Sequence, residues 1–209
     1  MGTTEKYIFI LLLALSAVWF PSSARAVEAK PVYKWVSANE YYFLLPTSQD
    51  LAISGAGTAS VKPWGFGFRA VGHETFAKTG GLQFQSIKVD NPSTGRNTFY
   101  LWELLAGMEY IAPKVQGKPL RVTASAIADF GLSDTTFFVV PILSAGLLYA
   151  TEEYSATPTG FTFDIYYRLA DIDLDSVGGG RAGTLKPALG FKVGYIFEGF
   201  WTTKEKKAD

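Results

Sequence analysis

Residues 120–130 read LRVTASAIADF, and every even position in this stretch holds an apolar side chain. Most odd positions are polar: Arg121, Thr123, Ser125 and Asp129. Successive side chains of a β-strand point to opposite faces of a sheet, so this period of two predicts a strand with one apolar face. Residues 161–170 and 189–198 repeat the pattern, which indicates that the strand at 120–130 belongs to a larger sheet.

Further strands are expected at residues 51–61, 64–71, 81–89, 98–112 and 136–150, and stretches rich in Gly, Pro, Asn and Asp separate them. The alternation is weakest at 51–61 and 81–89, and Pro141 predicts a local distortion because proline cannot donate to the ladder. We therefore expect an all-β fold: a single up-and-down antiparallel transmembrane β-barrel of about eight strands, with ten as the alternative. This barrel would span residues 51–201.

The first 26 residues have the parts of a secretory signal peptide. Lys6 precedes an apolar run over residues 7–20, and the small residues Ala24 and Ala26 fit the pockets of signal peptidase. A run of 14 residues is short for a helix that needs about 20 residues to cross a membrane. We predict cleavage after Ala26, so that residues 27–50 become an N-terminal lead-in. That lead-in could be an extended segment, a short helix over the barrel end, or an extra strand at 32–45.

Composition excludes several classes of protein. The chain has no cysteine, so neither disulfides nor an acylated lipoprotein anchor are available. Without residues 1–26, 17 basic and 18 acidic residues remain in 183, with no long block of either sign. Nucleic-acid binding therefore has little support. Only 18% of the chain is charged and 15% is aromatic, which favours transmembrane strands over a soluble domain.

The two faces of the predicted strands favour a membrane barrel over a soluble one. The apolar face is rich in Phe, Tyr, Leu and Val, whereas the other face carries mainly Gly, Ala, Ser, Thr and single charges. Small polar residues suit the crowded interior of a narrow barrel, and large apolar ones suit lipid. Tyr100 and Tyr110 share a face ten residues apart. With a strand tilt of about 40°, that spacing covers ~25 Å, the height of an apolar band between aromatic girdles.

The signal, the alternation and the closing segment KVGYIF at 192–197 together resemble the small outer-membrane β-barrels of the OmpA/OmpX-type architecture. The resemblance covers residues 51–201 and implies the outer membrane of a Gram-negative bacterium. It also implies outer-membrane lipid and the barrel-assembly machinery as partners. The sequence departs from the usual ending, because Gly199 stands where a second aromatic is expected. A polar tail, residues 202–209, follows the last aromatic residue, Trp201.

If the apolar face meets lipid, the single charges of the other face point into the lumen. The predicted lumen charge network consists of Glu103, Glu109, Arg121, Asp129, Asp164, Arg168, Lys192 and Glu198. An eight-stranded barrel is just wide enough to be filled by its own side chains, and unpaired buried charges are costly. We expect cross-strand ion pairs that plug the lumen; the alternative is a narrow path for ions or solutes.

Three aspartates, Asp171, Asp173 and Asp175, alternate with apolar residues and would stack on one face of a strand. Like charges repel there, so a positive partner is expected. A divalent cation is one candidate and Arg168 or Arg181 the other. The pattern begins like a calcium loop, but Ser176 holds the position that requires glycine, so it is no EF-hand.

His73, the one histidine of the chain, lies in an expected turn and has no partner recognisable from sequence, so we expect no catalytic role. We therefore predict a non-enzymatic outer-membrane barrel without cofactor, with a structural or surface-interaction role and a surface ligand that the sequence does not identify. A small channel or ligand-carrying barrel is the first alternative. A lipid-modifying enzyme that uses His73 is the second.

Overall fold

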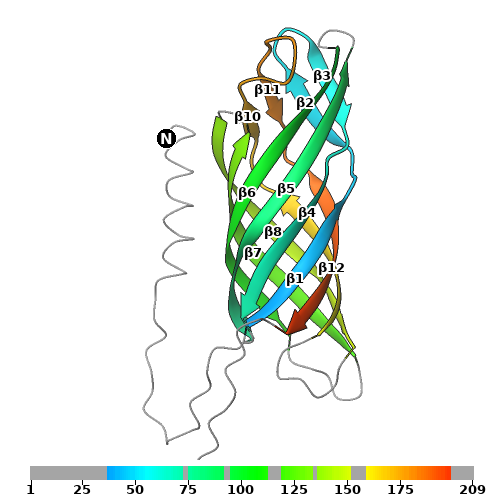
Figure 1. Ribbon diagram of the computed structural model, residues 1–209, viewed down its shortest axis with the longest axis vertical. Coiled ribbons are helices and arrows are strands. Elements are labelled where there is room, and N and C mark those ends of the chain that lie inside the picture. The colour runs from blue at the N-terminus through cyan, green and yellow to red at the C-terminus, as the bar shows by residue number, and fades with distance from the viewer. Residues whose placement is uncertain are drawn as a thin grey trace, which may run out of the picture.

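Twelve β-strands make up the part of the chain that the computed structural model describes, which is residues 37–72, 75–91, 95–112, 119–133, 136–151 and 159–198. Eight of them form a closed antiparallel barrel (Figure 1). These are β1 (Ser37–Leu45), β4 (Trp64–Gly72), β5 (Phe76–Asn91), β6 (Gly95–Ile111), β7 (Leu120–Ser133), β8 (Thr136–Ala150), β9 (Gly160–Arg168) and β12 (Leu189–Glu198). Within these ranges, no helix has the length and apolar character needed to cross a membrane. The predicted all-β, up-and-down barrel of eight strands is confirmed.

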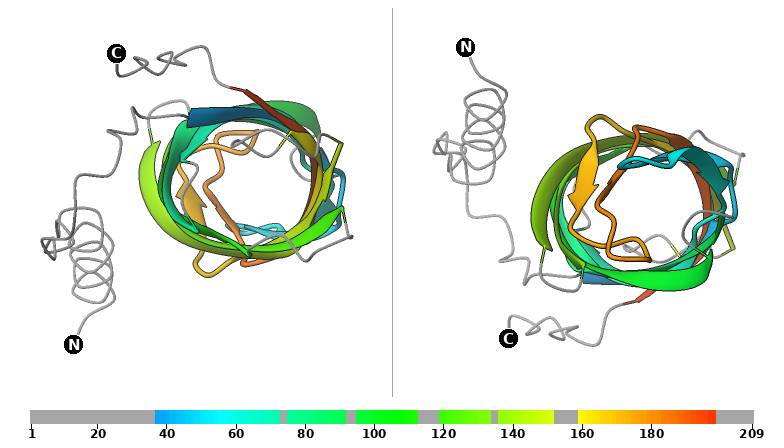
Figure 2. Two further views of the ribbon diagram at one scale, coloured as in Figure 1. Left: turned by 90° about the horizontal axis from the view of Figure 1, so that it is seen from below. Right: turned by 90° about the horizontal axis from the view of Figure 1, so that it is seen from above.

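The barrel closes where β1 pairs with β12, and the ring of strands is visible end-on in Figure 2. The register fixes the tilt of the strands. A row of paired residues that starts at Gln85 on β5 can be followed around the barrel, from strand to strand, to Ile111 on β6. The N–H of Ile111 donates to the carbonyl of Thr75, directly before the start of β5. The row therefore returns to the β5 segment at Thr75, ten residues before Gln85, and the shear number of the barrel is ten. Eight strands with this stagger tilt by about 40° from the barrel axis.

Side chains alternate between the lumen and the outer surface along every barrel strand, as the period of two requires. On β9 the alternation is complete: Thr162, Asp164 and Arg168 are buried inside, whereas Phe161 and Phe163 are exposed outside. Because one face of each strand meets a crowded interior, a slip of one residue would turn charges outward and aromatics inward. The hydrophobic pattern therefore sets the register.

The first barrel strand is β1, which lies within the segment 27–50 that we expect from the sequence to be a lead-in. β1 pairs with β12 on one side and with β4 on the other, so residues 37–45 belong to the barrel. Residues 51–61, expected to be a barrel strand, lie outside it. The predicted number of strands was correct, but one member was wrong, and the barrel begins at Ser37 instead of residue 51. The proposed extra strand at 32–45 was the alternative closest to the structure.

The remaining four strands form a small sheet over one end of the barrel, the upper end in Figure 1. β2 (Gln49–Ile53) and β3 (Gly57–Val61) come from the connection between β1 and β4. β10 (Ile172–Leu174) and β11 (Gly183–Leu185) come from the connection between β9 and β12. β2 pairs with β11, so two connections far apart in sequence form one sheet, which we call the cap.

The cap buries an apolar core against the inner face of the upper barrel. Leu51, Ile172 and Leu185 of the cap are fully buried. They pack in one cluster with residues of the upper β5, β6 and β8, among them Ile87, Leu101 and Val140. Val177, just before three glycines with positive φ, joins this cluster, and its N–H donates to the carbonyl of Arg181. The Gly178–Gly180 run is therefore a turn anchored by Val177.

Glycines inside the barrel make room for aromatic rings on neighbouring strands. Gly67 lies directly opposite Tyr42, and Gly190 directly opposite Tyr166. A Cβ atom on Gly67 would come within 2.2 Å of the Tyr42 ring, and one on Gly190 within 2.2 Å of the Tyr166 ring. The frequent glycine in these strands thus has a packing cause, since a narrow lumen holds a large ring only where the opposite residue has no side chain.

Pro141 causes no slip in the sheet. The pairing of β7 with β8 runs through Ala128 opposite Pro141 without interruption, so the expected distortion is absent on that side. On the other side the regular pairs of β8 with β9 end at Ile142, and the carbonyl of Pro141 accepts a bond from Leu169 N–H. The proline therefore stands where the β8–β9 ladder ends and where its missing N–H matters least.

Candidate functional site

The lumen holds two layers of charged and polar side chains. The lower layer is centred on Glu40 of β1, which is fully buried. Its carboxylate pairs with Arg69 Nε and accepts a hydrogen bond from the Thr162 hydroxyl. Arg69 Nη1 lies 3.0 Å from Glu109 Oε2, so this guanidinium connects carboxylates from two strands. The buried cation is thereby paired on two sides, which a buried charge requires.

Lys192 of β12 completes the lower layer. Its ammonium lies 2.8 Å from Asp164 Oδ2 and 3.5 Å from Glu40 Oε2. It also stands over the Tyr42 ring, 4.7 Å from the centroid, within the range of a cation–π contact. The Asp164 carboxylate accepts a further bond from the Thr123 hydroxyl at 3.0 Å. Five ionisable side chains from five strands thus form one connected network.

The upper layer is centred on Glu103 of β6. Its carboxylate accepts hydrogen bonds from Gln83 Nε2 at 2.7 Å and from Gln85 Nε2 at 2.8 Å. Arg168 Nη2 lies 3.7 Å from Glu103 Oε1, and Arg168 Nη1 donates to Gln49 Oε1 at 3.5 Å. These distances are long, so this layer is bonded more loosely than the lower one. Gln49 begins β2, and the contact therefore connects the cap to the lumen.

Asp129 of β7 also lies in the upper layer and is fully buried. Its carboxyl group interacts with the Glu103 carboxyl and with the Arg168 guanidinium. Nε and Nη2 of Arg168 have no hydrogen-bond partner in the part of the chain that the structure describes. Glu103 and Asp129 stand on adjacent strands with their side chains directed inward. Two carboxylates thus share one nearby cation in this layer.

Apolar layers separate and enclose the polar ones. Below the lower layer, Val71, Ile111, Leu148 and Ile196 form an apolar floor with Ala77. Between the two polar layers lie Tyr42, Leu44, Leu105, Ile142 and Tyr166. The space left at this height is about 30 Å³, room for one or two water molecules. The apolar floor, the two polar layers with the apolar layer between them, and the cap thus follow one another along the lumen.

The structure places most of the predicted lumen charges together. Glu109, Asp164 and Lys192 lie in the lower layer, whereas Glu103, Asp129 and Arg168 lie in the upper one. Arg121 is half-buried near the lower end, and its Nε has no hydrogen-bond partner among the described residues. The side chain of Glu198 is outside what the structure describes. Two central residues, Glu40 and Arg69, were missing from the predicted set.

A signal for both missing residues was present in the sequence. Arg69 alternates with Phe66 and Phe68 and thus stands on the inward face of its strand. Glu40 alternates in the same way with Tyr41 and Phe43. It went unrecognised because residues 27–50 had been assigned to a lead-in segment, outside the barrel.

The three aspartates proposed as a cation site lie at the cap and are all exposed. Asp171 pairs with Lys186 at 2.9 Å, and Asp173 accepts a hydrogen bond from the Thr184 hydroxyl at 2.9 Å. The bond from Lys186 to Asp171 raises the pKa of the lysine ammonium above its usual value. Among the described residues, no three His, Cys, Asp or Glu side chains are close enough to hold one metal ion. The cation site stays a prediction, and calorimetric titration with Ca²⁺ tests it.

Several other predicted features lie outside the described residues. They are the signal peptide and its cleavage site, His73 and its neighbour Glu74, Trp201 and the polar tail 202–209. The glycine-rich string at Gly65–Ala70, which resembles a dinucleotide-binding motif only in its letters, lies within strand β4 as expected. The structure thus offers no loop before a helix at this string, which that motif requires.

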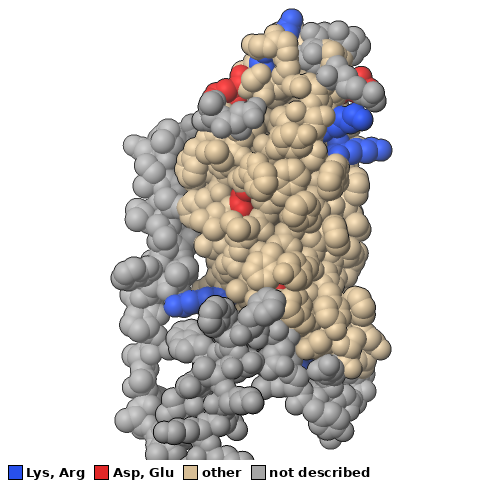
Figure 3. All heavy atoms as spheres, viewed as in Figure 1, with Lys and Arg blue, Asp and Glu red and all other residues tan. Residues whose placement is uncertain are grey.

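The outer surface of the barrel is an apolar band. Among the described outward-facing side chains of the eight strands, Lys78 near the lower end, and Lys88 and Asp90 near the upper end, are charged. The middle of the face in Figure 3 is mostly tan, with blue side chains near its upper and lower edges. Tyr110 packs on Phe76 at the lower edge, and Tyr100 stacks on Phe84 towards the upper one. Tyr100 and Tyr110 therefore stand near opposite edges of the band.

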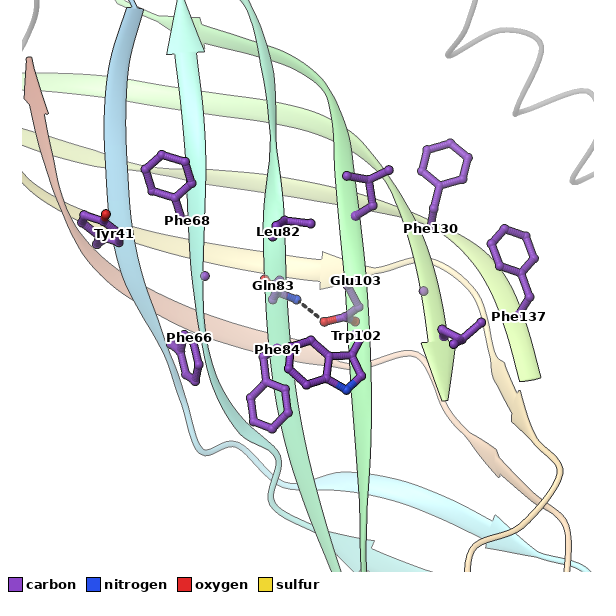
Figure 4. A pocket seen from close by; sticks show the side chains of 14 residues that line it. Tyr41, Phe66, Phe68, Leu82, Gln83, Phe84, Trp102, Glu103, Phe130 and Phe137 are labelled. Atoms are coloured by element: carbon purple, nitrogen blue, oxygen red, sulfur yellow. Dashed lines mark hydrogen bonds between the residues drawn. The ribbon is translucent and has the colours of Figure 1, made fainter. Parts of the chain in front are cut away.

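A depression of about 560 Å³ crosses this band, and we call it the outer groove. Two rows of large side chains line it (Figure 4). One row contains Phe66, Phe84 and Trp102, and the other contains Phe68, Leu82, Leu104 and Phe130. The register pairs Phe66 with Phe84 and Phe84 with Trp102, so the rows run across the strands. Hence the groove slopes across the band.

No protein-family model matches this chain, and no curated protein matches it. The chain is similar to the solved structure of the outer membrane protein OprG from Pseudomonas aeruginosa, with 12% identity and a TM-score of 0.47, over 83% of this chain and 100% of that one. It is also similar to Ail, the attachment invasion locus protein of Yersinia pestis, with 14% identity and a TM-score of 0.42, over 79% and 100% of the two chains. For Neisserial surface protein A, identity is 16% and the TM-score 0.41, over 76% and 95%. At these scores, the membrane assignment rests on the barrel's own surface.

Proposed function

We propose that this chain is an exported outer-membrane β-barrel protein with a structural or surface-interaction role. The observation that carries the proposal is the apolar band on a closed barrel. Leu82, Leu104 and Leu143 are each about half exposed at mid-height, where a soluble barrel would expose charged or polar side chains. Closed barrels and helices are the structures that satisfy all backbone hydrogen bonds within lipid.

The proposed orientation follows from the two ends of the barrel. The cap, which is built from the two elaborate connections, faces the exterior, whereas β1 begins and β12 ends at the opposite, periplasmic end. Long connections outside and strand termini inside are typical of bacterial outer-membrane barrels. Outer-membrane lipid and the barrel-assembly machinery are the partners in this proposal. Cleavage after Ala26 belongs to it as well, and a mature protein that begins at Val27 on N-terminal sequencing would support it.

The filled lumen favours a closed barrel over a channel. Two apolar layers, floor and cap, enclose two layers of ion pairs, and the space described between them, about 30 Å³, has room for one or two water molecules. Ions would have to cross apolar layers that offer no replacement for their hydration shell. The expected role is therefore that of a rigid scaffold that displays the cap.

Two measurements test the proposal. Folded membrane barrels keep their structure in mild detergent, so electrophoretic mobility should shift when the membrane-extracted protein is boiled. An unshifted protein in the soluble periplasmic fraction would reject the membrane assignment. In planar bilayers, the purified barrel should give no steady conductance, and stable channel openings would replace the scaffold with the channel. Lipase activity that is lost in His73→Ala would argue for the enzyme instead.

A further inference from the structure

Two exposed lysines, Lys62 and Lys88, lie where the apolar band ends near the cap. Lys88 lies on β5, and Lys62 lies two residues before Trp64, which pairs with Ser86 on β5. Lys62 itself lies in the short connection between β3 and β4, next to the point where β4 begins to pair with β5. Both side chains are exposed, and blue side chains gather at this edge of the surface in Figure 3.

The two lysines have no ion-pair partner within the described ranges, whereas Lys186 and Lys192 each have a carboxylate partner. Asp90 lies two residues further along β5, on the same face as Lys88. Two positive charges at one edge of the band repel each other. An external anion between the two ammonium groups would remove this repulsion.

The surface directly below the pair is apolar and lined by aromatic residues. Phe84 precedes Lys88 by four residues on the same face of β5. Phe66 of β4 follows Lys62 by four residues. Both phenylalanines line the outer groove. At ~3.3 Å per residue, each lysine lies about 13 Å of strand from its phenylalanine. A ligand that contacts both the two lysines and the outer groove would have an anionic head group and long apolar chains.

We propose that Lys62, Lys88 and the adjoining outer groove bind one phosphorylated, acylated glycolipid of the outer leaflet. The phosphate lies between the two ammonium groups, and an acyl chain lies along Phe66, Phe84 and Trp102. The inference rests on the proposed outer-membrane function, because it requires that the cap end faces the leaflet in which such lipids occur. The opposite edge of the band has a single lysine, Lys78, on β5, and offers no comparable pair among the described residues.

The test measures lipid binding by the full-length mature protein. Native mass spectrometry of the detergent-solubilised barrel counts bound lipid during titration with lipid A that carries both phosphates, and with the same lipid dephosphorylated. The double variant Lys62→Gln/Lys88→Gln removes the proposed site. The variant Lys78→Gln/Lys186→Gln removes two lysines elsewhere and is the matched control. All four positions are exposed or half-exposed, so the fold should tolerate these changes.

The wild-type protein should prefer the phosphorylated lipid by roughly 25-fold, since each of the two lysines near an anionic surface contributes about fivefold. This preference should disappear in Lys62→Gln/Lys88→Gln and persist in the control. An unchanged preference in the first variant, or equal loss in both, would overturn the site. Equally tight, lysine-dependent binding of phosphatidylglycerol would overturn the assignment to a glycolipid.

The same samples separate this inference from the function on which it rests. A barrel whose mobility shifts on boiling but which shows no phosphate preference loses the lipid site and keeps its membrane assignment. A protein without the mobility shift would lose both.

Discussion

At the residue scale, the alternation in the sequence identifies which side chains face inward but not which of them meet. The inward position of Asp164 and Lys192 could be predicted from their strands. The contact between Arg69 and Glu40 could not, because it depends on β1 lying between β12 and β4. Which inward-facing side chains contact each other depends on the register between strands and on how the barrel closes. The sequence of a single strand determines neither.

The central position of Glu40 leads to a prediction about stability. Glu40→Gln leaves Arg69 and Lys192 buried with one carboxylate partner fewer each. Breaking a buried ion pair by removing one partner costs about 3–5 kcal/mol. Urea unfolding of the barrel in lipid vesicles, followed by the gel mobility shift, should show a loss of this size.

Asp171→Asn provides the control, because Asp171 pairs with Lys186 on the exposed surface of the cap. An exposed pair contributes about 0–1 kcal/mol, so the unfolding curve should hardly move. Equal losses for the two variants would mean that the lower lumen layer is solvated and does not hold the barrel together.

The glycine opposite Tyr42 gives a second prediction at this scale. Gly67→Ala places a methyl group within 2.2 Å of the Tyr42 ring, whose hydroxyl donates a hydrogen bond to Gln83 Oε1. Overpacking of this kind costs about 1–3 kcal/mol. The control is Gly80→Ala, whose new Cβ meets only the Leu105 carbonyl at 3.3 Å. If Gly67→Ala unfolds at the same urea concentration as Gly80→Ala, ring packing does not limit the lumen.

At the element scale, the sequence predicts how many strands close the barrel but misidentifies one of them, because β1 takes the place expected for residues 51–61. Residues 41–45 are apolar at every position, because Tyr42 and Leu44 face the apolar middle layer of the lumen while their neighbours face outward. Alternation is therefore lost in β1. It is present at Leu51, Ile53, Ala59 and Val61, since one face of β2 and β3 packs on the cap core. Period alone does not distinguish a barrel strand from a cap strand, because both bury one face.

The cap should loosen independently of the barrel. Leu51→Ala removes a fully buried side chain from the core under the cap, at a cost of about 2–5 kcal/mol. Hydrogen exchange should accelerate in residues 46–63 and 169–188, while the barrel strands stay protected and the mobility shift on boiling persists. Thr58→Ala, at an exposed position of β3, should leave exchange unchanged. Faster exchange throughout the barrel strands would instead make cap and barrel one cooperative unit.

At the scale of the whole molecule, closure of the barrel joins the apolar outer faces of the single strands into one continuous apolar band. A shear of ten tilts eight strands so that their apolar outer faces align at one height, between aromatic residues near both edges. The lumen reverses this arrangement, because its charged layers lie at the heights where the outside is apolar. The fold thus keeps ionised groups away from lipid by pairing them inside, which a barrel of this width permits.

This arrangement predicts that an outward charge costs more the deeper it lies. Leu104 faces outward in the middle of the band and is 53% exposed, whereas Thr98 faces outward on the same strand near the upper edge. In a bilayer, Leu104→Arg should cost about 2–4 kcal/mol and Thr98→Arg about 0–1 kcal/mol. Urea unfolding in vesicles measures both. In a soluble barrel both substitutions would be surface changes of little effect. Equal and small losses of unfolding free energy for Leu104→Arg and Thr98→Arg would therefore reject the membrane assignment.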